Sequence, residues 1–191
     1  PRPIANDGPE ANALVRWLFQ EAARILKPEG SCCCCCCGGG PDPQFARWSL
    51  WMDEHLTFKQ MVIWDKGPMG LGWHYRRSYE TVLVGHRGDK CNWYDDTDRI
   101  ENIIRHIRKI IPAKDDHPTP KPEALVAFFL NLHSQPGDLV LDPFMGAGTT
   151  LLAAKNLRRH AIGIELEERY CEQAAKRLSQ EVFDFAEAVP A

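Results

Sequence analysis

Residues 139–150, with the sequence LVLDPFMGAGTT, decide the fold of this chain. The apolar run Leu139–Leu141 has the composition of a buried strand, and it ends at the carboxylate of Asp142. Glycines follow in the turn, and the residues after Gly148 have the pattern of a helix. Glycines leave the backbone of such a turn accessible, and the first amides of a helix lack partners. The turn therefore suits a polar ligand that carries a carboxylate or a phosphate.

A second strand and a second helix follow this turn. We predict a helix from Gly148 to about Asn156, a strand over 160–164 and a helix over 167–180, which form a β-α-β-α unit with parallel strands. Glu165, at the end of the second strand, is placed to accept hydrogen bonds from ribose hydroxyls, which predicts a ligand that contains a nucleoside. The alternative is that the glycines only form a tight turn and that Glu165 only starts a helix.

Other nucleotide-binding loops fit this turn less well. A dinucleotide fingerprint requires a third glycine where this chain has Leu151, and the Gly-Lys-Ser/Thr of a phosphate-binding loop is absent. The glycine spacing therefore favours neither of these two ligand classes.

The chain upstream of this unit also alternates between helices and strands. We predict helices over residues 10–27, 43–56, 98–111 and 122–133, and strands over 32–37, 58–64 and 78–85. The last two strands are expected to form an antiparallel hairpin with a long loop. The first consists of six consecutive cysteines, which we interpret as a buried parallel strand because free cysteine packs as a small hydrophobe. Neighbouring side chains of a strand point to opposite faces, so we expect no metal site there; a redox or metal role is the alternative.

The composition favours a globular domain over a membrane or secreted protein. The chain has 191 residues, of which 44% are hydrophobic, and its formal net charge is −3. No apolar run approaches the roughly 20 residues that a membrane helix requires, and the first residues do not resemble a signal peptide. We therefore expect one domain in an intracellular protein.

The turn and two further motifs resemble a known family. The segments 142–150, DPFMGAGTT, 163–165, GIE, and 117–122, HPTPKP, are similar to the S-adenosylmethionine site of DNA amino-methyltransferases, which methylate adenine N6 or cytosine N4. The order of the motifs is that of a permuted branch in which the cofactor motif is C-terminal, and the resemblance covers residues 10–178. It implies a Rossmann-like α/β methyltransferase fold, a three-layer α/β/α sheet that is circularly permuted and incomplete.

The resemblance assigns residues to two halves of a single methyltransferase domain. A base-side half covers residues 1–97, and a cofactor half covers residues 98–191. The residues expected to bind S-adenosylmethionine are His117, Thr119, Lys121, Asp142, Phe144, Gly146, Gly148, Thr149, Thr150 and Glu165. The glycines and Thr149 would approach the methionine end of the cofactor, Asp142 would order the loop and the amino group, and Glu165 would hold the ribose. His117, Thr119 and Lys121 would close the methionine side.

The segment 66–80, KGPMGLGWHYRRSYE, is similar to the family's segment beside the target-base pocket. Aromatic and basic side chains on a glycine-rich loop suit a displaced base and its flanking phosphates. The residues expected to contact double-stranded DNA with a flipped target base are Lys66, Trp73, His74, Arg76 and Arg77. The alternative is a solvated loop whose aromatic residues pack against the core. Arg105, Arg108 and Lys109 are interpreted as ordinary solvated charges.

One part of the family's site is missing from the sequence. Members carry an Asp, Asn or Ser followed by two prolines and an aromatic residue, which grips the amine hydrogens and stacks on the base. No two consecutive prolines occur here, so we predict no catalytic residue and interpret the chain as an N-terminally truncated fragment. In the family's fold the strand before that motif lies between the strands over 139–141 and 32–37. We therefore expect these two strands either to pair directly or to leave backbone groups unpaired.

Three functions are compatible with the sequence. The favoured one is transfer of a methyl group from S-adenosylmethionine to an exocyclic amine of DNA by the parent protein. The alternatives are a non-catalytic DNA-binding remnant and a methyltransferase for a non-DNA acceptor. The resemblance also implies a cytoplasmic protein of bacterial or phage type from a restriction-modification system. Its expected partners are DNA and a second copy or a missing N-terminal segment, without membrane association.

Overall fold

The fold is given by a computed structural model that describes residues 10–36, 44–67, 76, 78–110 and 120–180. The chain divides into two compact units. The first comprises residues 1–109 and 131–134, and the second comprises residues 110–130 and 135–191. None of the helices in the described part of the chain has the length and apolar character needed to cross a membrane.

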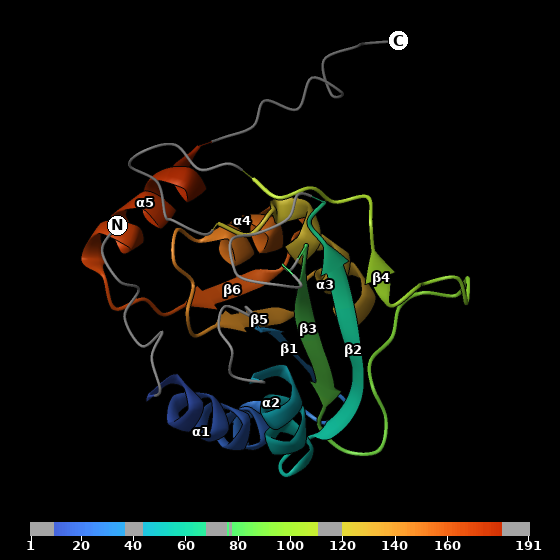
Figure 1. Cartoon of the computed structure of the whole chain (residues 1–191). Coiled ribbons are helices and arrows are strands. Elements are labelled where there is room, and N and C mark those ends of the chain that lie inside the picture. Colours follow the sequence, from blue (N-terminus) through green and yellow to red (C-terminus); the bar gives the residue numbers. More distant parts are fainter. Residues whose placement is uncertain (1–9, 37–43, 68–75, 77, 111–119, 181–191) are drawn as a thin grey trace. The chain divides into compact units, whose positions relative to one another are not determined.

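A four-stranded mixed sheet forms the centre of the first unit (Figure 1). Its strands are β1 (Ser31–Cys36), β2 (Thr57–Asp65), β3 (Tyr79–His86) and β4 (Ile103–Ile104), in the spatial order β1-β3-β2-β4. β3 pairs antiparallel with β1 and β2, whereas β4 pairs parallel with β2. The predicted antiparallel hairpin of β2 and β3 is confirmed.

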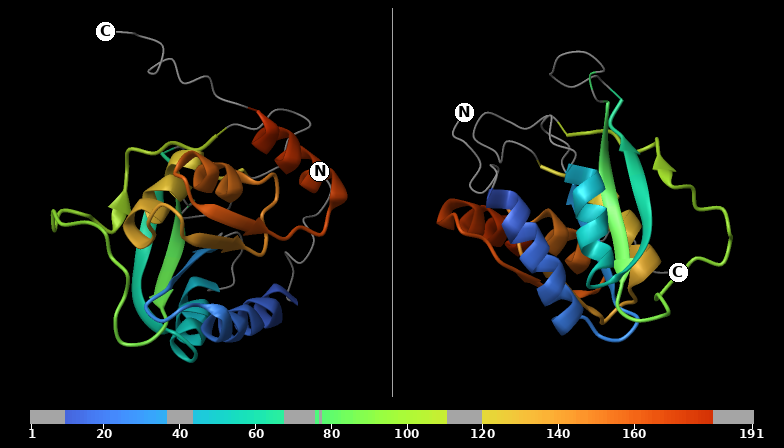
Figure 2. Two further views of the ribbon diagram at one scale, coloured as in Figure 1. Left: turned by 180° about the vertical axis from the view of Figure 1, so that it is seen from behind. Right: turned by 60° about the horizontal axis from the view of Figure 1, so that its bottom comes forward.

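Two helices, α1 (Glu10–Ile25) and α2 (Gln44–Asp53), pack against one face of this sheet (Figure 2). Both helices agree with the prediction. Phe19 of α1 and Met52 of α2 are fully buried and pack with Leu83 at the centre of β3. Burial of each such side chain contributes about 1.5–3 kcal/mol, so this cluster is a main source of stability in the first unit.

The cysteine strand differs from the prediction in direction and in burial. β1 runs antiparallel to β3 and lies at the edge of the sheet, so it is not a buried parallel strand. Cys32 and Cys34 pack against the cluster around α1 and α2, whereas Cys33 and Cys35 point to the other face and are exposed. This alternation follows from the pleat of a strand that has one covered face. Among the residues that the structure describes, no group of three or more potential metal ligands occurs.

The segment 98–111 is not the helix that its isoleucine spacing predicts. Its described part contains the short strand β4 and is otherwise irregular. The indole Nε1 of Trp64 on β2 donates a hydrogen bond to the carbonyl of Ile107 at 2.7 Å. Ile104 and Ile107 are buried, and β-branched residues suit an extended backbone. The contact with β2 therefore overrides the helical periodicity of the isoleucines.

His133 belongs to a small polar cluster in the first unit. Its Nδ1 lies 3.1 Å from the hydroxyl of Ser31 and 3.2 Å from the carbonyl oxygen of Asn92. The ring of Trp93 packs edge-on against the imidazole, with ring centroids 5.4 Å apart. Burial lowers the pKa of His133 below its ordinary value of 6.5, and the hydrogen bond to Asn92 offsets part of this effect. The folded protein therefore resists protonation of this imidazole more than the unfolded chain does.

We expect the free energy of unfolding to fall as the pH decreases below the ordinary histidine pKa of 6.5. The unfolded chain takes up a proton there that folded His133 resists, and the loss levels off below the lower folded-state pKa. Urea denaturation of the wild type and of His133→Gln between about pH 5 and pH 8 measures this effect. The variant should lose less stability than the wild type, and an equal loss in both proteins would contradict the expectation.

The second unit contains the predicted β-α-β-α sequence. β5 (Leu139–Asp142) and β6 (His160–Gly163) pair in parallel, and α4 (Thr149–Asn156) connects them (Figure 2). α5 (Glu168–Ser179) follows. α3 (Glu123–His133) begins directly after Pro122, and its residues up to Leu130 belong to this unit. Ala153 and Ala154 are buried where α4 packs on the two strands. The prediction of a parallel unit around the glycine turn is confirmed.

β1 and β5 each have one edge without a strand partner in the described residues. β1 pairs with β3, and β5 pairs with β6. Of the two expected outcomes, direct pairing or unpaired edges, the structure has the second. On the β5–β6 pair, Leu139 and Ile162 are 58% and 51% exposed, which leaves an apolar face next to the open edge. Open edges beside apolar side chains are typical of surfaces that another polypeptide covers.

Candidate functional site

The turn after β5 is held by its own backbone and by β6. Asp142 Oδ1 accepts a hydrogen bond from the amide of Phe144 at 3.0 Å, which fixes the first bend. The amide of Met145 donates to the carbonyl of Ile164 at 3.0 Å, and the amide of Ile164 donates to the carbonyl of Asp142 at 2.9 Å. Asp142 therefore orders the turn with its side chain as well as with its backbone.

The carboxylate of Glu165 closes the turn from the end of β6. Its Oε2 accepts a hydrogen bond from the amide of Gly146 at 2.9 Å. Its Oε1 accepts hydrogen bonds from the amides of Leu166 and Glu167 at 2.8 and 2.9 Å. A carboxylate oxygen has two acceptor positions, so Oε2 can accept a ligand hydroxyl besides the Gly146 amide. The sequence predicts Glu165 as a ribose ligand, and the structure adds a second role in holding the glycine turn.

Gly148 occupies a position at which a side chain does not fit. Its φ of 77° lies in the left-handed region that favours glycine. A Cβ atom there would lie 2.6 Å from the Cβ of Ala174 in α5. Gly163 of β6 is packed as closely, because a Cβ there would overlap the Sδ of Met145. The two glycines thus allow β6 and α5 to pack directly against the turn.

The amino end of α4 follows the turn, and no acidic side chain of the helix offsets its partial positive charge. Gly148 provides no side-chain cap, and no acidic residue stands in the first turn of α4. The first amides of a helix lack intrahelical acceptors, and the helix dipole adds partial positive charge there. Thr149 is buried and Thr150 is half-buried, whereas Phe144 of the turn is 53% exposed. A carboxylate is the kind of ligand group that this end of the helix attracts.

Arg177 of α5 supports the turn, although no sequence motif points to it. Its Nη1 donates a hydrogen bond to the carbonyl of Ala147 at 2.7 Å and lies 3.4 Å from Thr149 Oγ1. The guanidinium is half-buried between α5 and the turn. Its basic position in the last turn of a helix indicates only a favourable dipole interaction, so local sequence carries no signal for this contact.

The remaining predicted cofactor residues precede α3. Lys121 is half-buried in the second unit and engaged in an interaction with another group. His117 and Thr119 lie outside the residues that the structure describes. The contribution of this proline-rich segment to the site therefore stays a prediction.

The residues predicted to contact DNA lie around the loop between β2 and β3. Lys66 Nζ forms an ion pair with Glu80 at 3.1 Å, with both side chains mostly buried, so the fold neutralises its charge. The amide of Lys66 donates to the carbonyl of Ser78 at 2.8 Å and closes the base of the loop. Arg76 is exposed. Trp73, His74 and Arg77 lie outside the described residues, so their DNA contacts stay predictions.

Comparisons with known proteins agree with the predicted family and fold. A family model described as DNA methylase, for N6 and N4 methyltransferases, matches residues 10–176. The Type II methyltransferase M.HpaI of Haemophilus parainfluenzae is 41% identical over 80 residues, which are 42% of this chain and 26% of that protein. M2.DpnII of Streptococcus pneumoniae is 33% identical over an alignment of 120 residues that covers 56% of this chain and 45% of that protein. The chain thus spans less than half the length of these two curated relatives.

A solved methyltransferase structure has a similar fold over most of the chain. The crystal structure of M1.HpyAVI in complex with SAM superposes with a TM-score of 0.70 at 31% sequence identity. The superposition covers 90% of this chain and 85% of that one.

Proposed function

This chain belongs to the DNA methylase family of N6 and N4 methyltransferases, and from this premise we propose that the turn over residues 142–150 binds S-adenosylmethionine. The observation that carries the proposal is the hydrogen bond from the Gly146 amide to Glu165. It brings an acidic acceptor next to a turn whose glycines leave the backbone open. The family relationship supports the α/β methyltransferase fold that the sequence predicts.

The residues of the turn fit the parts of this cofactor. The amino end of α4 attracts the carboxylate of its methionine portion, and Glu165 accepts hydrogen bonds from its ribose hydroxyls. Asp142 keeps the turn in shape and offers acceptor capacity near its start. As the resemblance implies, His117, Thr119 and Lys121 would close the methionine side. S-adenosylmethionine supplies an activated methyl group on its sulfonium.

We further propose that the parent protein methylates an exocyclic amine of adenine or cytosine in DNA. Arg76 and the loop around it would contact the phosphates next to a flipped base. Since the polar-Pro-Pro-aromatic tetrad does not occur in the sequence, we expect this chain alone to bind the cofactor without transferring the methyl group. A second candidate, a DNA-binding remnant without cofactor binding, has the exposed Arg76 in its favour.

Titration calorimetry of the chain with S-adenosylmethionine tests the proposed function. We expect saturable binding at one site, and about tenfold weaker binding by Thr149→Val, which removes one buried hydroxyl at the start of α4. Thr57→Val, on β2 in the first unit, is the matched control and should bind like the wild type. A folded chain that binds duplex DNA but gives no heat with S-adenosylmethionine would favour the DNA-binding remnant instead.

A further inference from the structure

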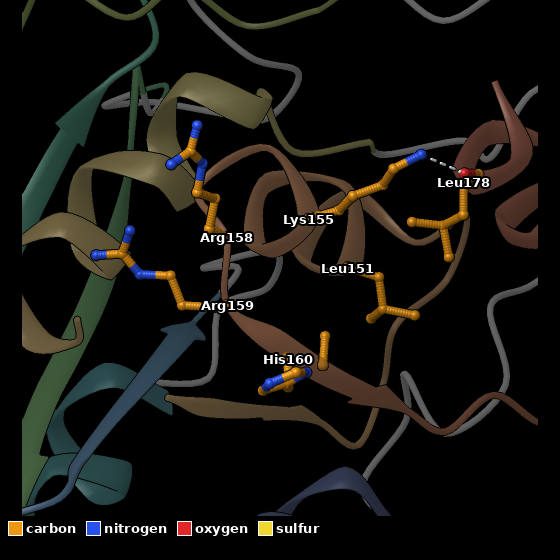
Figure 3. Close-up of a pocket in the computed structure, with 7 residues that line it drawn as sticks. Leu151, Lys155, Arg158, Arg159, His160 and Leu178 are labelled. Atoms are coloured by element: carbon orange, nitrogen blue, oxygen red, sulfur yellow. Dashed lines mark hydrogen bonds between the residues drawn. The ribbon is translucent and has the colours of Figure 1, made fainter. Parts of the chain in front are cut away.

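A basic pocket lies at the turn between α4 and β6 (Figure 3). Its volume is about 400 Å³. Four of its lining residues, Lys155, Arg158, Arg159 and His160, are basic or histidine, and the others are apolar. No acidic side chain lines it among the residues that the structure describes. The pocket therefore concentrates positive charge in a chain whose formal net charge is −3.

The cations of the pocket differ in what they contact. Lys155 Nζ donates to the carbonyl of Leu178 at 2.6 Å, and Arg159 Nη1 donates to the carbonyl of Leu157 at 2.6 Å. The side chain of Arg158 is exposed, and it makes no hydrogen bond or ion pair within the described part of the chain. In Figure 3, the guanidinium groups of Arg158 and Arg159 both lie on the side of the turn away from Leu178. Arg158 thus presents its donors to a ligand, next to a second guanidinium that the backbone holds in place.

The backbone at Arg158 is unfavourable for any residue with a side chain. Its φ is 61°, in the left-handed region. The amide of Arg158 donates to the carbonyl of Lys155 at 3.0 Å, and the amide of Arg159 donates to the carbonyl of Ala154 at 2.8 Å. These are the two hydrogen bonds of a Schellman helix ending, in which glycine usually takes the left-handed position. The chain therefore carries a guanidinium where glycine would be more stable.

We propose that this pocket binds a phosphate group, carried by a free phosphorylated molecule or by a nucleic-acid backbone. Guanidinium groups donate paired hydrogen bonds that match phosphate oxygens, and a pocket without carboxylates does not repel the anion. Arg158 is the main donor to the phosphate. Arg159 contributes charge and further donors at the same turn, and the imidazole of His160 contributes a ring nitrogen.

The pocket is separate from the cofactor turn. Leu139 and His160 are paired in register at the amino ends of β5 and β6, whereas Asp142 and Gly163 are paired at the carboxyl ends, beside the turn over residues 142–150. Three residue steps along a strand correspond to about 10 Å. A variant of the pocket should therefore leave S-adenosylmethionine binding unchanged, which separates this proposal from the proposed function.

The left-handed backbone of Arg158 allows variants that remove the guanidinium with and without relieving the backbone, and these variants test the phosphate site. Arg158→Gly removes the guanidinium and also relieves the backbone, whereas Arg158→Gln removes the charge and keeps the unfavourable conformation. Both variants should bind pyrophosphate at least about tenfold more weakly than the wild type in calorimetric titrations. Arg158→Gly should also melt roughly 2–4 °C higher than the wild type, which excludes unfolding as the cause of lost binding. Lys176→Gln, on an exposed residue of α5 outside the pocket, is the control for net charge.

Duplex DNA distinguishes the two sources of phosphate. If the ligand is a nucleic-acid backbone, the binding of a short duplex should depend less on salt in both Arg158 variants. The negative slope of log K against log salt concentration should become smaller in magnitude by about one. Loss of pyrophosphate binding with an unchanged slope would assign the pocket to a free phosphorylated molecule. Unchanged pyrophosphate binding together with an unchanged slope would overturn the proposal.

Discussion

Replacing Gly148 with aspartate is expected to abolish binding of S-adenosylmethionine, with a loss of affinity of at least about 100-fold. The left-handed φ of 77° and the 2.6 Å approach of a Cβ to Ala174 leave no room for a side chain. The new carboxylate would also stand at the amino end of α4, where the proposed cofactor places its own carboxylate. Backbone strain and overpacking together should lower the free energy of unfolding by about 2–5 kcal/mol. Calorimetric titration and thermal melts measure the two effects.

A matched pair of variants separates misfolding from loss of the site. Gly148→Ala introduces the Cβ without a charge, and Ala174→Gly removes the atom that it would meet. The double variant should recover the overpacking part of the loss, about 1–3 kcal/mol, but not the backbone part. If Gly148→Asp folds and binds S-adenosylmethionine as tightly as the wild type, the cofactor does not occupy this turn.

Replacing Glu165 with alanine should also weaken S-adenosylmethionine binding by about 100-fold, for a different reason. The alanine leaves the amides of Gly146, Leu166 and Glu167 without their carboxylate acceptor. Hydrogen bonds to charged groups contribute about 1.5–3 kcal/mol each, although water replaces part of this at a half-buried site. The turn therefore loses its shape, and the ribose loses its acceptor. Calorimetry measures the affinity, and amide hydrogen exchange at Gly146 reports on the turn.

Two further substitutions serve as an intermediate case and a control for the effect of Glu165→Ala on S-adenosylmethionine affinity. Glu165→Gln keeps one carbonyl acceptor and should fall between the wild type and the alanine variant in affinity. Glu167→Gln changes an exposed neighbour whose ion pair with Arg169, at 3.7 Å, is itself exposed, and it should bind like the wild type. Wild-type affinity in Glu165→Ala would remove Glu165 from the proposed cofactor site.

The second unit was predictable because its signals are local. The strand, the glycine turn and α4 follow one another within residues 139–156, and the parallel pairing of β5 and β6 follows from the helix between them. Asp142 and Glu165 stand at strand ends, which the sequence alone can locate. The hydrogen bond that joins Glu165 to Gly146 is a consequence of that parallel pairing.

The errors arose where distant residues decide the structure. The isoleucines of segment 98–110 have a helical spacing, but β2 and the indole of Trp64 hold the segment as a strand and an irregular stretch. The cysteine run predicts a strand, but its antiparallel direction depends on β3, about 50 residues later in the chain. The contact of Arg177 with Ala147 is equally remote from the glycine motif. Hydrophobic periodicity and local motifs do not indicate which distant residues a segment contacts.

The contact between Arg177 and the turn limits how far the chain can be shortened. The DNA methylase model ends at residue 176, so a version of the chain trimmed to that match would retain the glycine turn and Glu165. It would nevertheless lose Arg177, whose guanidinium donates a hydrogen bond to the carbonyl of Ala147. It would also lose Leu178, whose carbonyl accepts a hydrogen bond from Lys155. A fragment that ends at residue 176 therefore contains all the recognisable motifs, but it lacks contacts that hold the turn in position.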